Sequence, residues 1–202
     1  MPGILAAAIL LANLAVSPVL AQQQAMRIRG TVEAVDGAML TVKSRDGKAT
    51  YKVKLTDNAA VRGIVKAGLG DITDNSYIGV TGMPQSDGSQ KAVEIHIFPE
   101  PLRGVGEGHR PWDLVPNSTM TNATVAQMVK GVQGSEITLK YKEGEKKILV
   151  TPETVIVTYV PGDKSELKPG AKIFIAAANK RDDGTLEAAA VSVGRDGITP
   201  PM

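Results

Sequence analysis

Apolar and polar residues alternate along most of the chain after residue 25, a period of two that predicts β-strands rather than helices. Glycine-containing turns of the hairpin type, such as Asp36-Gly37 and Asp87-Gly88, separate the runs. The predicted strands of the first half are 31–35, 39–43, 50–55, 60–65, 77–82 and 92–98. A polar turn at 69–75 has room for one helical or 3-10 turn.

The same order of turns and apolar runs returns in the second half at a nearly constant offset. Leu40-Thr41-Val42-Lys43 corresponds to Ile137-Thr138-Leu139-Lys140, and Tyr77-Ile78-Gly79-Val80 corresponds to Lys172-Ile173-Phe174-Ile175. Later strands are predicted at 155–160, 171–178 and 186–193, with a polar turn at 164–170. The pattern indicates two diverged copies of one module of about 70 residues.

Three strands, a short helical link and two strands are the order of an OB-like Greek-key barrel. The predicted fold class is therefore all-β, with two tandem OB-like Greek-key β-barrels, each holding at most a short helical turn between its late strands. A barrel of this size has a small core and is marginal alone. We therefore expect the two barrels to dock on each other.

The first 21 residues carry no charged side chain and have the pattern of a secretory signal peptide. An apolar run from Ile4 to Val16 is too short to span a bilayer, and Val19-x-Ala21 precedes the expected cleavage before Gln22. An uncleaved anchor is the alternative, because no Lys or Arg precedes the run. The predicted division of the chain is 1–21 signal peptide, 22–98 first barrel, 99–125 inter-repeat segment, 126–194 second barrel and 195–202 C-terminal tail.

Composition excludes several classes of protein. The chain has no Cys, which excludes a disulfide scaffold, a thiol nucleophile and a cysteine metal site, and export without Cys favours a bacterial periplasmic or secreted protein. A net charge of +2 and 3% aromatic residues argue against a nucleic-acid partner. After residue 21 no stretch is long and apolar enough for a transmembrane span, and no motif indicates a bound cofactor.

Residues 99–125 have no counterpart in the second copy and hold the only Trp of the chain. Pro111-Trp112 is a good anchor, so Arg110, Trp112 and Leu114 are predicted to form a structural bridge between the barrels. A contact to a partner or ligand is the alternative role, because loops on a rigid scaffold often carry binding residues.

A metal site can be built from Glu107, His109 and Asp113, since one imidazole and two carboxylates suit a divalent cation. The spacing is weak support, because a glycine-rich loop imposes no geometry. The second histidine, His96, shares a strand face with Glu94, opposite the apolar residues of that strand. We expect it to lie outside the barrel, either exposed or between the two modules.

Two segments carry a resemblance to a known family. Arg29-Gly30-Thr31-Val32-Glu33 with Asp36-Gly37, and the Gly-rich run from Arg103 to Leu114 around Trp112, resemble an exported proteobacterial family of unknown function with repeated OB-like domains. The resemblance implies a small β-barrel and bacterial export, and it implies no catalytic residue.

The hypothesis that fits these patterns is an exported, non-enzymatic β-barrel protein that acts as an envelope interaction or ligand-binding module. Its partner would be an envelope protein or a small ligand. Hydrolase elbows, zinc-protease helices and SxxK elements do not occur in the sequence. The alternatives are a periplasmic accessory protein that handles divalent metal and a small enzyme with an unrecognised site.

Overall fold

The computed structural model describes residues 25–131 and 134–202 and confirms that these residues form an all-β fold. The predicted signal peptide and its cleavage point lie outside the described residues. In chain order the elements are β1 (Met26–Asp36), β2 (Met39–Ser44), β3 (Thr50–Lys66), η1 (Leu69–Asp71), β4 (Tyr77–Pro84), β5 (Gln90–Ile97), η2 (Glu100–Leu102), β6 (Gly108–Pro111), β7 (Thr119–Gly131), β8 (Gly134–Tyr141), β9 (Gly144–Val150), β10 (Val155–Pro161), η3 (Lys164–Glu166), β11 (Lys172–Lys180) and β12 (Leu186–Gly194). Each η element is a 3-10 turn.

Most of these elements lie where the local pattern of the sequence predicted them, whereas β6 and the start of β7 fall in the inter-repeat segment 99–125, where no strand was predicted. Gly37 turns β1 into β2 at a φ of 56°, and Gly88 turns β4 into β5 at a φ of 84°, a region that residues with a Cβ adopt at a cost. The two predicted polar turns contain η1 and η3. One difference is that the strands expected at 50–55 and 60–65 form the single long strand β3.

Five strands close a first barrel in the order β1-β2-β3-β12-β11, with β11 returning to β1. All neighbours are antiparallel except β3 and β12, which are parallel and place Val53 opposite Leu186. Alternate side chains point inward, so Leu40, Val42 and Ile173 are fully buried in one apolar cluster. Closure removes the unpaired edges that a short sheet would expose.

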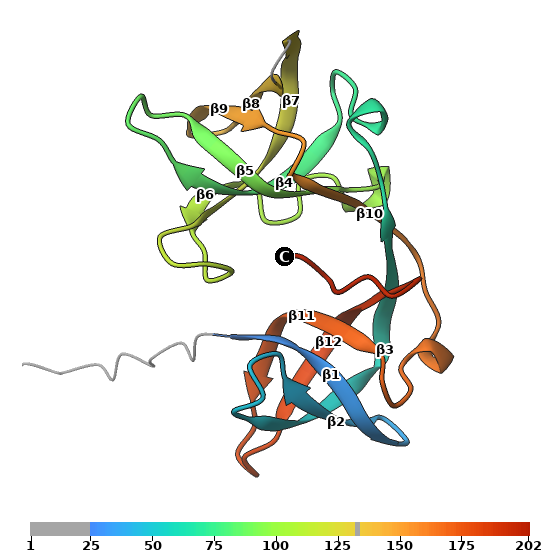
Figure 1. The fold of residues 1–202 in the computed structure, drawn as a ribbon. Helices are drawn as coiled ribbons and strands as arrows, with labels where there is room; N and C mark the ends of the chain where they lie inside the picture. Colours follow the sequence, from blue (N-terminus) through green and yellow to red (C-terminus); the bar gives the residue numbers. More distant parts are fainter. Residues whose placement is uncertain (1–24, 132–133) are drawn as a thin grey trace, which may run out of the picture.

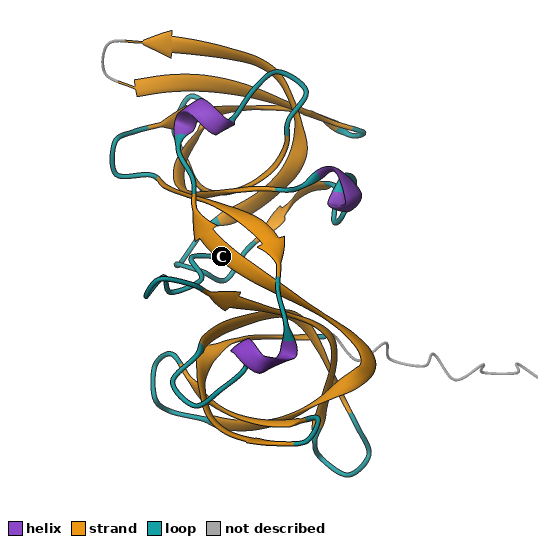
Figure 2. Ribbon diagram, turned by 90° about the vertical axis from the view of Figure 1, so that its right-hand side faces the viewer, coloured by secondary structure: helices purple, strands orange, loops and turns teal. Residues whose placement is uncertain are grey.

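The pairings also close a second ring in the order β7-β8-β9-β5-β4, with β4 returning to β7. Its parallel contact joins β5 to β9, where Gln90 lies opposite Ile148. Ile95, Ile137 and Leu139 are among its buried residues. Figure 2 shows the two rings nearly end-on, one above the other.

The strand pairings differ from the predicted tandem arrangement in which residues 22–98 close one barrel and 126–194 the other. Each ring takes three strands from one half of the chain and two from the other half. The cause is the long strand β3, which leaves the first ring and pairs with β10 where the chain passes between the rings (Figure 1). Because Ile64 of β3 lies opposite Tyr159 of β10, the two crossing strands hold the rings together.

The region between the rings, which we call the waist, has an apolar core of its own. Ile64, Val157, Phe174 and Met202 are buried there together. The predicted C-terminal tail, 195–202, returns into the waist, where Figure 1 marks the C-terminus. The Nε atom of Arg29 on β1 donates a 2.7 Å hydrogen bond to the backbone oxygen of Met202, so this segment is part of the packed structure.

Candidate ligand-binding site

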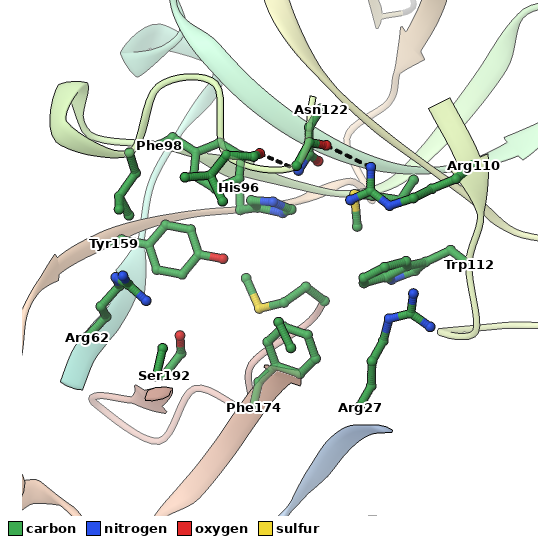
Figure 3. A pocket seen from close by; sticks show the side chains of 17 residues that line it. Arg27, Arg62, His96, Phe98, Arg110, Trp112, Asn122, Tyr159, Phe174 and Ser192 are labelled. Carbon is green, nitrogen blue, oxygen red and sulfur yellow. Dashed lines mark hydrogen bonds between the residues drawn. The ribbon is translucent and has the colours of Figure 1, made fainter. Parts of the chain in front are cut away.

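A cavity of about 290 Å³ lies at the waist, with walls from both rings. Its size is near the lower end of the range for small-molecule sites in proteins. Figure 3 shows the side chains around it. The labelled residues are Arg27, Arg62, His96, Phe98, Arg110, Trp112, Asn122, Tyr159, Phe174 and Ser192.

One wall is the outer face of the second ring. Three residues lie side by side there, because they are cross-strand partners on neighbouring strands. Gly79 on β4 lies opposite His96 on β5 and opposite Asn122 on β7. A Cβ at Gly79 would overlap the imidazole of His96 and lie 2.7 Å from Oδ1 of Asn122. The absence of a side chain at residue 79 therefore lets these two polar side chains lie close over the sheet.

The neighbouring carboxylate fixes the orientation of His96. Oε1 of Glu94 lies 3.0 Å from Nδ1 of His96 and accepts a 3.0 Å hydrogen bond from the Thr81 hydroxyl. In the tautomer that carries its proton on Nδ1, His96 donates to this carboxylate and Nε2 lies on the other side of the ring. The aromatic ring of Phe98 packs edge-on against the imidazole, with centroids 4.8 Å apart.

The sequence predicted on which face of its strand His96 lies, but it did not predict whether the side chain is buried. Glu94 and His96 point away from the interior of the second ring, as the alternation of β5 required, yet their side chains are only 1% and 4% exposed. The reason is that β10 pairs with β5, and Tyr159 of β10 covers the imidazole at a centroid distance of 5.8 Å. His96 lies between the modules, which was one of its two expected positions.

Trp112 forms a second wall, half-buried beside the waist core. The guanidinium carbon of Arg27 on β1 lies 3.9 Å from the ring centroid, and that of Arg110 on β6 lies 5.5 Å away. Figure 3 shows the indole between these two side chains. Contacts of this kind are worth about 0.5–2 kcal/mol each. The Arg27 contact joins this segment of the second ring to the first strand of the first ring.

The third wall comes from the first ring. Phe174 on β11 lies opposite Ser192 on β12, and Ser192 lies opposite Arg62 on β3. The hydroxyl of Tyr159 points toward the middle of the cavity in Figure 3. Burial raises the pKa of this phenol, and the negative charge of Glu94 raises it further, so Tyr159 stays a hydrogen-bond donor at neutral pH.

Two buried polar atoms on the cavity walls have no hydrogen-bond partner among the described residues. They are Nε1 of Trp112, which is a donor, and Oδ1 of Asn122, which is an acceptor. Nδ2 of Asn122 does have a partner, because it donates a 3.1 Å hydrogen bond to the backbone oxygen of Val105. An unpaired buried polar atom costs about 1–3 kcal/mol, so both walls carry unsatisfied hydrogen-bonding capacity.

The cavity also has an excess of positive charge. Burial lowers the pKa of the Arg110 guanidinium, and the nearby charge of Arg27 lowers it further. Arg27 lies 3.5 Å from the carboxylate of Asp113, whereas Arg62 and Arg110 pair with no carboxylate in the part of the chain that the structure describes. The guanidinium remains charged, since its pKa lies far above neutral.

The predicted metal set is not assembled. Glu107 accepts a hydrogen bond from the backbone N–H of Lys142, and Nδ1 of His109 lies 2.8 Å from the Thr121 hydroxyl. Asp113 binds Nη2 of Arg29 at 2.8 Å. Within residues 25–131 and 134–202 no three His, Asp or Glu side chains are placed to hold a metal ion. This leaves the metal hypothesis without a site in the described residues.

The predicted bridge residues lie in different surroundings. Arg110 and Trp112 line the cavity, and Nη1 of Arg110 donates to the backbone oxygen of Gly106 at 2.7 Å. Leu114 is half-buried and is not part of the cavity wall. The segment 99–125 that carries them forms η2, β6 and the start of β7, and β6 pairs with β7.

Sequence reasoning missed Arg62, Tyr159, Phe174 and Ser192. For Phe174 and Ser192 the sequence does contain a signal, because small or apolar residues occupy both faces of β11 and β12. Ala176 and Ala190 stand on the outward face, where a solvated strand would carry charged side chains. Strands that are apolar on both faces are covered on both faces, which marks this surface as a contact.

Comparisons with protein families, curated proteins and solved structures gave no match to the chain. None of the described residues belongs to a helix of the length and apolar character needed to cross a membrane. The fold and the site define an all-β protein with a closed five-stranded barrel, further strands and a cavity lined by rings and arginines.

Proposed function

We propose that the protein is a non-enzymatic module that binds a small organic ligand in the waist cavity. The observation that carries this proposal is the pair of unpartnered atoms on the cavity walls, Nε1 of Trp112 and Oδ1 of Asn122. Native proteins satisfy nearly all their buried polar groups, so such atoms call for a partner from outside the chain. Neither atom is reached by solvent in this conformation, so a ligand in the cavity would contact them only after these side chains rotate.

The proposal places the protein in the envelope of a bacterium. Support comes from the uncharged apolar run of residues 1–21, from a chain without Cys, and from the resemblance to exported proteins with OB-like domains. In this proposal the two rings are diverged OB-like modules that have exchanged their last two strands. The exchange brings two outer sheet faces together and so creates the cavity.

The Glu94–His96 pair has an orienting role in this proposal. With Nδ1 of His96 bound to the carboxylate, Nε2 is available to a ligand hydroxyl or amide. Several aromatic rings supply the apolar surface that small-molecule sites use for affinity. The polar groups then fix how the ligand lies.

Binding can be tested with N-phenyl-1-naphthylamine, a neutral dye whose fluorescence rises in apolar surroundings. We expect saturable binding at one site in the full chain. Ala190→Leu fills the cavity, because Ala190 lines it, and should abolish the signal. Ala189→Leu is the matched control, since Ala189 is exposed and is not part of the cavity wall, so it should leave binding unchanged. Equal fluorescence for all three proteins would contradict the proposal.

A further inference from the structure

Three hydrogen-bond donors from three strands meet at one end of the waist cavity. Arg62 on β3 and Ser192 on β12 are direct cross-strand partners, and Tyr159 on β10 is paired with β3 two residues from Arg62, opposite Ile64. Figure 3 shows the Tyr159 hydroxyl toward the middle of the cavity, with Arg62 and Ser192 on the same side. We call these three residues the donor cluster.

The donor cluster has no internal acceptor. No hydrogen bond joins the guanidinium of Arg62 or the hydroxyls of Ser192 and Tyr159 to another group in the described residues, and all three side chains line the cavity. The nearest buried carboxylate, Glu94, already accepts from Thr81 and His96. A guanidinium beside two hydroxyls is well suited to a carboxylate or sulfonate, which accepts several hydrogen bonds at once.

Aromatic and apolar side chains also line the cavity. Phe174 and Trp112 line the cavity together with Met120 and Met202. A volume of about 290 Å³ has room for a compound of one or two fused rings. A cavity lined by both arginines and aromatic rings favours a ligand that has an anionic group and an apolar body.

We infer that the ligand is an organic anion with a flat apolar body, whose anionic group is bound by Arg62, Ser192 and Tyr159. This inference rests on the proposed function and names the ligand class of the same site. The rings of Phe174 and Trp112 hold the apolar body. Arg110 adds a second unpaired positive charge at the Trp112 side, which raises the potential of the whole cavity.

The test compares 2-naphthoate with 2-naphthamide by isothermal titration calorimetry on the full chain. The two probes have nearly the same shape, and only the first is an anion. We expect naphthoate to bind at least ~10-fold more tightly, as a charge-assisted hydrogen bond requires. Arg62→Gln should remove this preference, by lowering the affinity for naphthoate much more than the affinity for naphthamide. Ser192→Ala and Tyr159→Phe should each weaken naphthoate binding several-fold.

The control for charge is Arg181→Gln, since Arg181 pairs with Glu187 on the exposed part of the β11–β12 hairpin. It should leave the affinities of both probes unchanged. Equal affinity of the two probes, with binding lost in Ala190→Leu, would overturn the anion inference and leave the cavity as a binding site. No binding of either probe at about 1 mM would overturn both proposals for ligands of this size.

Discussion

Gly79 lies directly beneath the imidazole of His96, because the two are cross-strand partners on β4 and β5. In the alignment of the two sequence halves, Phe174 stands at the position of Gly79 and Ser192 at that of His96. One half therefore carries a bulky ring where the other has no side chain. This divergence makes one wall of the waist polar and buried, and the facing wall aromatic.

Substitution of Gly79 tests this arrangement. Gly79→Ala should lower the free energy of unfolding by about 1–3 kcal/mol, the usual cost of overpacking, because the new Cβ overlaps the His96 ring. Urea unfolding measures the change. Gly70→Ala is the control, since a Cβ there would meet no atom within 4 Å, and it should have little effect. Similar losses for both variants would show that His96 does not pack over Gly79.

Trp112 reports on the waist. Because the indole is half-buried, Trp112→Ala should cost about 2 kcal/mol, less than the 3–5 kcal/mol of a fully buried aromatic residue. Trp112→Phe keeps a ring against Arg27 and should cost less. Fluorescence of the single Trp should lie at shorter wavelength in the folded protein than in urea. The same emission in both states would contradict its position in the waist.

Asp113 should make stability depend on pH at low pH. Burial alone would raise the pKa of this carboxyl, but the hydrogen bond from Arg29 and the charges of Arg29 and Arg27 outweigh it and lower the pKa. The folded state therefore favours the ionised form, so its stabilisation is present above the ordinary pKa of Asp, about 3.9, and is lost as the pH falls through the lower folded value.

The size of this effect should be small. Half of the Asp113 side chain is exposed, at 50%, so solvent screens the ion pairs and we expect less than about 1 kcal/mol. Urea midpoints of the native protein and of Asp113→Asn should differ at pH 6 and converge near pH 2. Asp182→Asn, in the exposed β11–β12 turn, is the control, and its urea midpoint should differ little from that of the native protein at either pH. A gap that stays constant with pH would refute the ion-pair explanation.

Strand exchange should make the two rings unfold together. Leu40 is buried in the first ring and Leu139 in the second, and either change to Ala should cost about 2–5 kcal/mol. Because each ring needs strands from both halves, circular dichroism and Trp112 fluorescence should show one shared transition in both variants. Val129→Ala, at a position 52% exposed, is the surface control.

Independent barrels would behave differently. Leu40→Ala would then unfold only the first ring at low urea concentration, and the circular dichroism curve would show two steps. That outcome would exclude the exchange of strands between the rings in solution. A shift of Trp112 fluorescence without a shift in circular dichroism would point to local loosening of the waist.

Much of the candidate site could not be predicted from sequence, and particular residues show why. Trp112 was singled out because it is the only Trp and lies in the unmatched segment, and it does line the cavity. Glu107, His109 and Asp113 were predicted to form a metal site from their side-chain types. In the structure each of them has a different hydrogen-bond partner, because a glycine-rich loop does not fix their relative positions. Arg62 and Tyr159 carried no motif, since their role depends on the crossing of β3 and β10.

The sequence by itself determined most of the strands and turns and the inward face of many strands, because period-two alternation and left-handed glycines act over a few residues. It could not determine which strands close which ring. The late strands of both halves, such as those containing Ile78 and Ile173, carry the same apolar pattern, so either pair fits either barrel. Only the tertiary structure decides between them, through the long strand β3 and its pairing with β10, and that choice buries His96 and forms the cavity.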